Sequence, residues 1–229
     1  MDYTNKYFSV LGDSISTLEG YSEPKEAAFY ELSYKLASGV LTPLDTWWGR
    51  VIERLGGKLL RNNSISGSTV CWHPSYEIPS YGCSEERTSS LGEEGLHPDV
   101  IMVFLGINDW GAGLPVRSYN PLQSEAPATF LCAYQKMLQK LKRNYPNAEI
   151  WCLTLPVSRC EGMEAFPYYY GGRHIAEYCD AIQEAAKEYG CRVIDLYTGK
   201  EPHDTIDGFH PNAKGMAILA DGVLSALDK

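Results

Sequence analysis

The sequence predicts a three-layer α/β/α sandwich built around a five-stranded parallel sheet. Strand-like apolar runs alternate with helical patterns along the chain, which is typical of a parallel sheet covered by helices on both faces. Residues 100–105 (VIMVFL) are the clearest strand, because an unbroken apolar run suits a central strand buried on both faces. The 229 residues contain no internal repeat, low-complexity tract or linker, so residues 1–229 are expected to form a single domain.

Four other apolar runs are expected to complete the sheet. Each is short enough for a strand, and helical patterns separate the runs from one another. The first strand is expected at residues 7–11, and a short second strand is expected around residues 59–61. The last two strands are expected at residues 150–155 and 192–196.

Helices are predicted from apolar residues at helical spacing. Residues 44–55 show this spacing, and Gly56 supplies a stop after them. The apolar stripe over residues 130–141 is expected to end near Pro146, because proline disfavours helix in the residue before it. Two more helices are expected at residues 175–189 and 213–227.

Two stretches are too long and irregular to be simple connections. They are residues 71–97 and residues 110–127, and each follows a candidate site segment. Long loops inside a compact domain usually carry function, so both stretches are candidate walls of a substrate pocket. The alternative interpretation is that they are tolerated surface insertions.

The composition argues against several classes of protein. Hydrophobic residues make up 44% of the chain and charged residues 21%, which is typical of a globular protein. The net charge of -9 would be repelled by phosphate backbones and anionic membranes, so neither nucleic acid nor a membrane is an expected partner. Residues 1–11 lack the pattern of a signal peptide, and we therefore expect a cytoplasmic protein.

Ser14 lies in the segment GDSIS (residues 12–16), directly after the first expected strand. Its position is therefore the carboxyl end of a parallel strand, where open α/β sheets bind ligands. A serine in such a segment is also a common helix N-cap or turn residue, since Ser and Asp favour both. The segment alone does not decide between these interpretations.

A candidate base for this serine lies near the other end of the chain, in DGFHP (residues 207–211). A base for a serine hydroxyl needs a pKa near neutrality and an acceptor that holds its far ring nitrogen. His210 meets the first need, and Asp207 could reach its Nδ1 from the same turn. The alternative is a loop aspartate followed by a histidine at the entry to a helix.

Two further segments offer hydrogen-bond donors for an oxyanion. GIND (residues 106–109) follows the strongest strand, and the Asn108 amide could donate there. NNSISG (residues 62–67) follows the second strand, and Gly67 would allow a substrate to approach the backbone closely. Each segment alone is ordinary turn chemistry. All four segments would meet at the carboxyl edge of one sheet, and this convergence indicates a site.

In this order, the four segments resemble the SGNH (GDSL-type) hydrolase superfamily of esterases, lipases and acylhydrolases. The resemblance implies a flavodoxin-like SGNH hydrolase fold. It also implies that Ser14 is the nucleophile, that His210 is the base and that Asp207 orients this base. The implied oxyanion hole consists of the backbone N–H groups of Ser14 and Gly67 and the side chain of Asn108.

The resemblance further implies a serine esterase that cleaves a carboxylic ester through an acyl-enzyme, with no cofactor and no metal. We expect a small-molecule ester with a short acyl chain, and an acetylated carbohydrate is one candidate. Trp72, Trp110 and residues 168–170 lie in expected loops, where aromatic rings stack on sugars or cover the core. Two residues depart from the family pattern: Ile15 replaces the usual Leu, and Ser64 replaces a Gly that many members have.

Two other functions remain open at this stage. A flavodoxin-like binding protein could hold a phosphate or a cofactor on the hydroxyl-rich loop at residues 14–17, although this leaves the Asp207 and His210 pair unexplained. A metal-dependent hydrolase could use residues 203–210, which include two histidines and two aspartates. No second cluster of matched ligands accompanies that segment in the sequence.

Overall fold

The five predicted strands form one parallel sheet. The computed structural model describes residues 2–22, 27–72, 80–117, 129–160, 163 and 165–228. The sheet has the order β2-β1-β3-β4-β8, with neighbouring strands parallel throughout, as expected from the sequence. The strands are β1 (Tyr7–Gly12), β2 (Lys58–Ser64), β3 (Val100–Phe104), β4 (Glu149–Leu153) and β8 (Arg192–Ile194).

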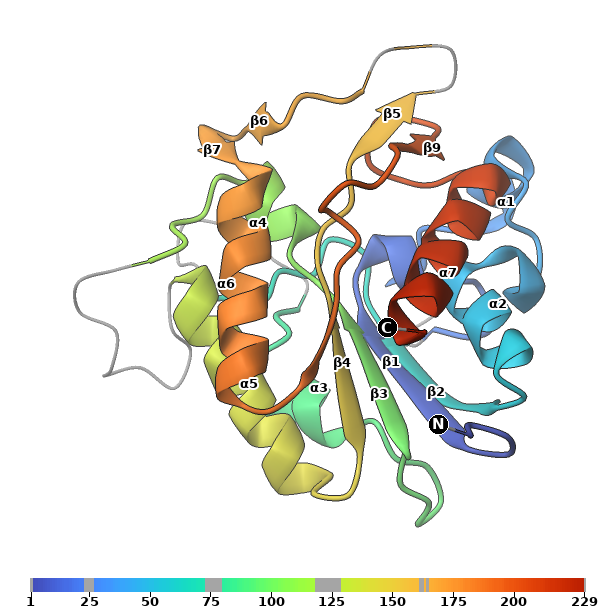
Figure 1. The fold of residues 1–229 in the computed structure, drawn as a ribbon. Helices are drawn as coiled ribbons and strands as arrows, with labels where there is room; N and C mark the ends of the chain where they lie inside the picture. The colour runs from blue at the N-terminus through green and yellow to red at the C-terminus, as the bar shows by residue number, and fades with distance from the viewer. Residues whose placement is uncertain are drawn as a thin grey trace.

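Helices cover both faces of this sheet, which confirms the three-layer prediction (Figure 1). On one face, α2 (Trp47–Arg54) packs beside α7 (Ala213–Leu227). On the other face, α5 (Phe130–Asn144) packs beside α6 (Ile175–Glu188). The predicted bounds of α7 agree with the structure, and those of α5 and α6 differ by only a few residues at one end.

The helix predicted at residues 44–55 is only partly correct. Residues Pro43–Asp45 form a separate 3-10 turn, η3, and α2 begins at Trp47. Thr46 separates the two, because its backbone is extended and its side chain accepts a hydrogen bond from Gly49 N. An N-cap of this kind satisfies a free N–H group in the first turn, so it fixes where the helix begins.

Several short elements were not predicted. The prediction that residues 71–97 are irregular is wrong over α3 (Glu85–Ser89), while residues 73–79 lie outside the described part. Of the second stretch, residues 110–127, the structure describes those up to 117. The other elements that were not predicted are α1 (Leu32–Ser38), α4 (Ile107–Gly111) and two small sheets, β5 (Ser158–Cys160) with β9 (His203–Thr205) and β6 (Tyr169–Tyr170) with β7 (Arg173–His174). All of these elements are too short to show a periodic apolar pattern in the sequence.

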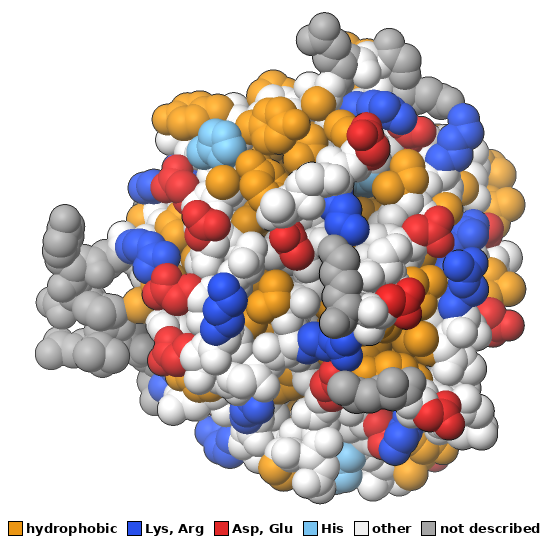
Figure 2. All heavy atoms as spheres, in the orientation of Figure 1, with side chains coloured by type: hydrophobic (Ala, Val, Ile, Leu, Met, Phe, Trp, Pro, Cys, Tyr) orange, Lys and Arg blue, Asp and Glu red, His pale blue; other side chains and the backbone are white. Residues whose placement is uncertain are grey.

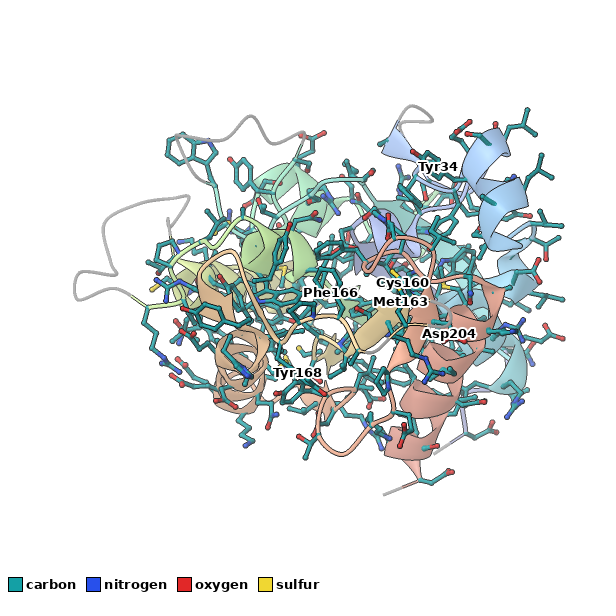
Figure 3. All side chains as sticks on the ribbon, turned by 90° about the horizontal axis from the view of Figure 1, so that it is seen from above. Tyr34, Cys160, Met163, Phe166, Tyr168 and Asp204 are labelled. Carbon is teal, nitrogen blue, oxygen red and sulfur yellow. The ribbon has the colours of Figure 1, made fainter. Side chains whose placement is uncertain are left out.

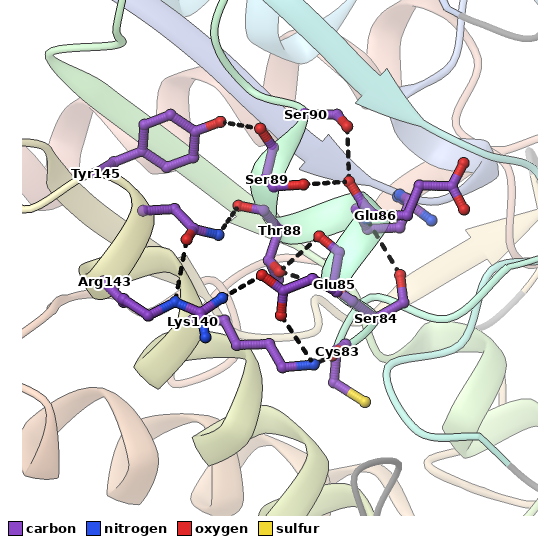
Figure 4. A network of polar contacts seen from close by, with 12 residues as sticks. Cys83, Ser84, Glu85, Glu86, Thr88, Ser89, Ser90, Lys140, Arg143 and Tyr145 are labelled. Atoms are coloured by element: carbon purple, nitrogen blue, oxygen red, sulfur yellow. Dashed lines mark hydrogen bonds and ion pairs between the residues drawn. The ribbon is translucent and has the colours of Figure 1, made fainter.

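Polar contacts fasten α3 to α5 on its outer side (Figure 4). Arg143 forms an exposed ion pair with Glu85. Side chains also donate hydrogen bonds to two backbone carbonyls at the end of α3 and to the carbonyl of the residue before its N-cap. These bonds are Lys140 Nζ to Cys83 O at 2.8 Å, Asn144 Nδ2 to Thr88 O at 3.0 Å and Tyr145 OH to Ser89 O at 2.6 Å.

The side chain of Arg87 in α3 is buried and binds the ends of two strands. Its Nη2 donates to Gly12 O at 2.8 Å, at the end of β1, and to Asn63 O at 2.9 Å, in β2. Its Nη1 donates to the hydroxyls of Ser68 and Ser80 at 2.7 and 2.9 Å. Burial lowers the pKa of Arg87 to about 10, so the guanidinium still carries its charge at neutral pH. One cation thus joins α3, β1 and the loop after β2.

Replacing Arg87 with Met should destabilise the protein strongly. The two hydroxyls can turn to other partners, but Asn63 O would lose this donor and Gly12 O would keep only the 3.2 Å bond from Ile65 N. A hydrogen bond from a charged donor contributes about 1.5–3 kcal/mol, so the loss of both bonds should lower the stability measured by urea unfolding by about 3 kcal/mol or more. The matched control is Arg143→Met, which removes an exposed ion pair with Glu85 and an exposed bond to Asn144 Oδ1 and should cost about 1 kcal/mol or less. Equal losses in the two variants would contradict the role of Arg87.

Candidate active site

The four candidate segments meet at the carboxyl edge of the sheet, at the top of Figure 1; Figure 3 looks down on this edge. Ser14 begins the 3-10 turn η1 (Ser14–Ser16) directly after β1. Gly67 lies in the turn after β2, and Asn108 lies in α4 after β3. His210 comes from the segment before α7. All four residues line one cavity of about 380 Å³.

Ser14, His210 and Asp207 form a continuous chain of hydrogen bonds. His210 Nε2 lies 2.9 Å from Ser14 Oγ, and His210 Nδ1 lies 2.6 Å from Asp207 Oδ2. The other carboxylate oxygen of Asp207 accepts from the backbone N–H groups of Phe209 and His210, at 2.9 and 2.8 Å. The backbone of its own turn therefore holds the Asp207 carboxylate in the orientation in which it contacts the His210 ring.

Asp207 carries a negative charge at neutral pH. Its partial burial raises the pKa, but the hydrogen bonds from the His210 ring and from the N–H groups of His210 and Phe209 outweigh this effect and bring the pKa to about 2. A carboxylate beside Nδ1 favours the tautomer that carries its proton there. In that tautomer, the lone pair of Nε2 faces the Ser14 hydroxyl.

The turn that carries Ser14 is held by core residues. Trp47 and Trp48 are buried, and their indole N–H groups donate to Ser16 Oγ at 3.1 Å and to Ser16 O at 3.0 Å. A Cβ added to Gly12 would lie 2.6 Å from Ser16 Cβ and 2.8 Å from Ser64 Oγ, so only glycine fits where β1 ends. The turn is thus fixed from α2 and from β2.

The hydroxyls of the loop at residues 14–17 have internal partners. Ser16 Oγ accepts from Trp47, while Thr17 Oγ1 donates to Ser14 O at 2.8 Å and accepts from Phe29 N at 2.8 Å. Both side chains are fully buried. A phosphate-binding loop needs donors that face its ligand, so this geometry does not support the binding-protein alternative.

Asn108 and Gly67 lie side by side in the wall of the cavity. Gly67 has a φ of +74°, a backbone conformation that side chains other than glycine rarely adopt. Asn108 Nδ2 donates to Ser68 O at 2.8 Å. This bond orients the amide and uses one of its two N–H groups, so the second N–H is available to a ligand in the cavity.

Asp109 was not predicted to have a role, but the structure places it under this same loop. Its buried carboxylate accepts from Val70 N at 2.8 Å, from Cys71 N at 3.2 Å and from Cys71 Sγ at 3.1 Å. Burial raises the pKa of Asp109 to about 6, against the effect of these hydrogen bonds. In the sequence, the one signal for this role is that a polar residue directly follows Asn108. The groups that bond to the Asp109 carboxylate lie about forty residues earlier in the chain.

The rest of the cavity wall is largely apolar and aromatic. Ile15, Ile107 and Leu114 line it together with Phe209 and Tyr170. Four rings, those of Trp110, Phe166, Tyr170 and Phe209, pack around one another with centroids 4.7–6.2 Å apart. Figure 2 shows apolar side chains gathered above β6 and β7, where Tyr168, Tyr169 and Tyr170 are exposed. Trp110 is buried and so covers the core, whereas these tyrosines are open to a ligand.

The segment at residues 203–210 does not assemble a metal site. His203 is buried with Nδ1 2.8 Å from Val157 O, and burial lowers its pKa to about 4. Asp204 pairs with Arg159 at 2.7 Å, whereas Asp207 pairs with His210. Within the described part of the chain, no three His, Cys, Asp or Glu side chains gather as ligands would. The sequence-based metal-hydrolase alternative thus lacks its cluster.

A hydrogen-bonded series of Ser, His and Asp side chains beside a cavity, at the carboxyl edge of an α/β sheet, is an arrangement that occurs in hydrolases. Comparison with known families identifies the group: the GDSL-like lipase/acylhydrolase family matches residues 6–161, and the chain belongs to this family of ester-hydrolysing enzymes within the SGNH superfamily. No protein of the curated set matches the sequence. None of the helices in the described ranges has the length and apolar character needed to cross a membrane.

Solved structures show the same similarity over nearly the whole chain. A structure named as a GDSL-like lipase from Bacteroides uniformis is 32% identical, with 98% of this chain and 96% of that chain covered and a TM-score of 0.75. A second one, from Bacteroides ovatus, is 28% identical, with 98% and 99% covered and the same TM-score. A carbohydrate acetylesterase from Sinorhizobium meliloti, 18% identical with 98% of each chain covered and a TM-score of 0.62, shares the fold.

The buried carboxyl of Asp13, next to Ser14, predicts a pH dependence of stability. Burial raises the pKa of Asp13 from 3.8 to about 7, although a hydrogen bond from Ile15 N opposes the shift. Between about pH 4 and 7 the folded protein therefore holds a proton that the unfolded chain has lost, so the free energy of unfolding falls as the pH rises. Asn at this position keeps the acceptor for Ile15 N but cannot titrate.

The Asp13→Asn variant should accordingly gain stability relative to the wild type as the pH rises from about 4 to 7, by more than about 1 kcal/mol in total, and show a constant difference above that. Urea unfolding across this pH range measures the difference. Asp180→Asn, at an exposed position of α6, controls for the loss of an acidic residue as such. Curves for Asp13→Asn and wild type that stay parallel from pH 4 to 8 would show that Asp13 is not protonated in the folded state.

Proposed function

We propose that the protein is a serine esterase in which Ser14 attacks the ester carbonyl and forms an acyl-enzyme. The observation that carries the proposal is the unbroken hydrogen-bond chain from Ser14 through His210 to Asp207, at the wall of an open cavity. A serine hydroxyl is a weak nucleophile unless an adjacent base accepts its proton. The 2.9 Å contact between Oγ and His210 Nε2 is within the range required for that transfer.

In the first step, His210 Nε2 takes the Ser14 proton while Oγ bonds to the carbonyl carbon. The imidazolium that forms lies against the charged carboxylate of Asp207, which stabilises it and holds the ring in place. His210 then gives this proton to the leaving alcohol. In the second step, water attacks the acyl-enzyme with His210 again as the base, and Ser14 is released.

The negative charge that develops on the carbonyl oxygen needs donors fixed in advance. In this proposal they are the backbone N–H groups of Ser14 and Gly67 and the free N–H of Asn108. Three features support this role: all three residues line the cavity, the Asn108 amide is oriented by Ser68 O, and Asp109 anchors the adjoining backbone through Val70 and Cys71. Donors held in this way need no rearrangement as the charge forms.

For the substrate, we propose an ester with a short acyl chain, the acyl group lying in the apolar part of the cavity. A volume of about 380 Å³ is at the small end for ligand sites, which argues against a long lipid chain. Tyr170 lines the same cavity and is 43% exposed, so its ring offers a stacking surface for a sugar alcohol. An acetylated carbohydrate fits both features, and a protein that shares the fold is a carbohydrate acetylesterase.

Asn108 provides the test of the oxyanion site. Its replacement with Ala should lower kcat for p-nitrophenyl acetate by roughly 10² to 10³, with little change in KM, because the bond strengthens only as charge develops. Asp109 is unsuitable as the neighbouring control, since it holds the loop that contains Val70 and Cys71. Asn144→Ala, which removes a donor to Thr88 O far from the cavity, is a better control for loss of an asparagine amide. Wild-type kcat in a folded Asn108→Ala protein would contradict the assignment.

Gly111 provides the test of the acyl pocket. This glycine lines the cavity, and a Cβ added to it would meet no atom within 4 Å. Gly111→Val should therefore fill the cavity without a clash. We expect the ratio of kcat/KM for p-nitrophenyl butyrate over acetate to fall by roughly 10-fold or more, since a methylene in an apolar pocket changes specificity by about that factor.

Gly111→Ala is the matched intermediate and should lower the same ratio by a smaller factor. Using a ratio of two substrates removes any general loss of activity from the comparison. A butyrate-to-acetate ratio that stays constant in both variants would mean that the acyl group lies elsewhere.

A further inference from the structure

The ring of Phe29 lies flat against the ring of His210. Their centroids are 3.5 Å apart and their planes differ by 8°. Tyr34 of α1, labelled in Figure 3, stacks on Phe29 at 4.4 Å and 27°. Because His210 occupies one face of the Phe29 ring, Tyr34 must occupy the opposite face. Phe29 is thus the middle ring of three, and the only ring of α1 or its preceding segment that touches the histidine in the described residues.

The backbone around Phe29 is tied to both partners of the hydrogen-bond chain. Phe29 N donates to Thr17 Oγ1 at 2.8 Å, and this hydroxyl in turn donates to Ser14 O at 2.8 Å. The hydroxyl of the next residue, Tyr30, donates a hydrogen bond to Pro211 O at 2.8 Å. Pro211 directly follows His210 in the chain. The aromatic face is therefore held in register with Ser14 on one side and with His210 on the other.

We propose that Phe29 is a positioning residue for His210 that stabilises the imidazolium formed during the reaction. The inference rests on the proposed role of His210 as the base. An aromatic ring has a negative face and attracts a cation centred within about 6 Å, and the attraction strengthens as water is excluded. At 3.5 Å the histidine ring lies well inside this range, and Tyr34 covers the outer face of Phe29. The stack therefore favours the protonated histidine in addition to the effect of Asp207.

Besides the stacked Tyr34, three titratable groups lie near this ring pair. Asp207 bonds to His210 directly. Tyr30 is buried, and burial raises its pKa well above the ordinary value, so it is neutral throughout the working range. Asp13 is buried beside Ser14, and burial raises its pKa to about 7. All three are present in every variant of Phe29, so a difference between two such variants reports the aromatic face and not these groups.

The test compares Phe29→Leu with Phe29→Tyr through complete pH profiles of kcat/KM for p-nitrophenyl acetate. Leucine keeps an apolar side chain but has no aromatic face. We expect Phe29→Leu to lower the plateau by roughly 3- to 30-fold and to move the acid limb of the profile to lower pH, because protonation of the histidine becomes less favourable. Phe29→Tyr retains the ring and should keep both the plateau, within about 2-fold, and the acid limb.

The shift of the acid limb separates this role from a structural one, since a distorted site would lower the plateau without making the enzyme active at lower pH. Tyr34→Leu removes the outer ring of the stack, which does not touch His210, so it should shift the plateau and the acid limb in the same direction as Phe29→Leu but by a smaller amount. The proposal is overturned if Phe29→Leu leaves the acid limb in place, whatever its plateau. His210→Gln distinguishes the two levels: retention of its activity would overturn the proposed function itself, whereas its inactivity beside an unmoved Phe29→Leu limb would overturn only the stacking role.

Discussion

The geometry of the site depends on the buried guanidinium of Arg87. Burying a cation costs several kcal/mol unless its N–H groups are satisfied. Two backbone carbonyls and two hydroxyls accept from the two terminal nitrogens of Arg87, while its buried Nε–H has no partner among the described residues. One carbonyl belongs to Gly12, two residues before Ser14, and one hydroxyl belongs to Ser68, next to Gly67. Because these bonds are short and shielded from water, they fix the distance between the end of β1 and the loop after β2. Ser14 and Gly67, which are the proposed nucleophile and one of the proposed oxyanion donors, lie on those two segments.

Three aspartate side chains at the same edge of the sheet have different roles. Asp207 is charged because hydrogen bonds outweigh its partial burial, and it faces the histidine. Asp13 and Asp109 are fully buried, and burial raises the pKa of each toward neutrality. Of the three, Asp207 is the carboxylate that bonds to His210, while the other two carboxyls accept hydrogen bonds from the turns that carry Ser14 and Gly67.

The sequence was sufficient to predict the sheet, the main helices and the meeting of Ser14, His210 and Asp207, because each follows from local pattern and from the rule that parallel strands end at one edge. Arg87, Asp109 and Phe29 were not predicted. Their partners lie far away in the chain, 75 residues for Arg87 and Gly12, and no local pattern indicates such contacts. The short helices α1, α3 and α4 were also missed, since five to seven residues do not establish a period. The start of α2 was also predicted wrongly, because the Thr46 N-cap fixes it and the apolar stripe begins earlier in the chain.

Covalent labelling tests the central claim, that Ser14 is the nucleophile, most directly. The protein would be treated with a p-nitrophenyl alkylphosphonate, which phosphonylates activated serines. It would then be digested, and the peptides would be analysed by mass spectrometry. The account predicts one equivalent of adduct, located on Ser14 and formed in step with the loss of esterase activity, and no adduct at Ser14 in the His210→Gln variant. Inactivation with Ser14 unmodified, or with the adduct on another residue, would contradict it.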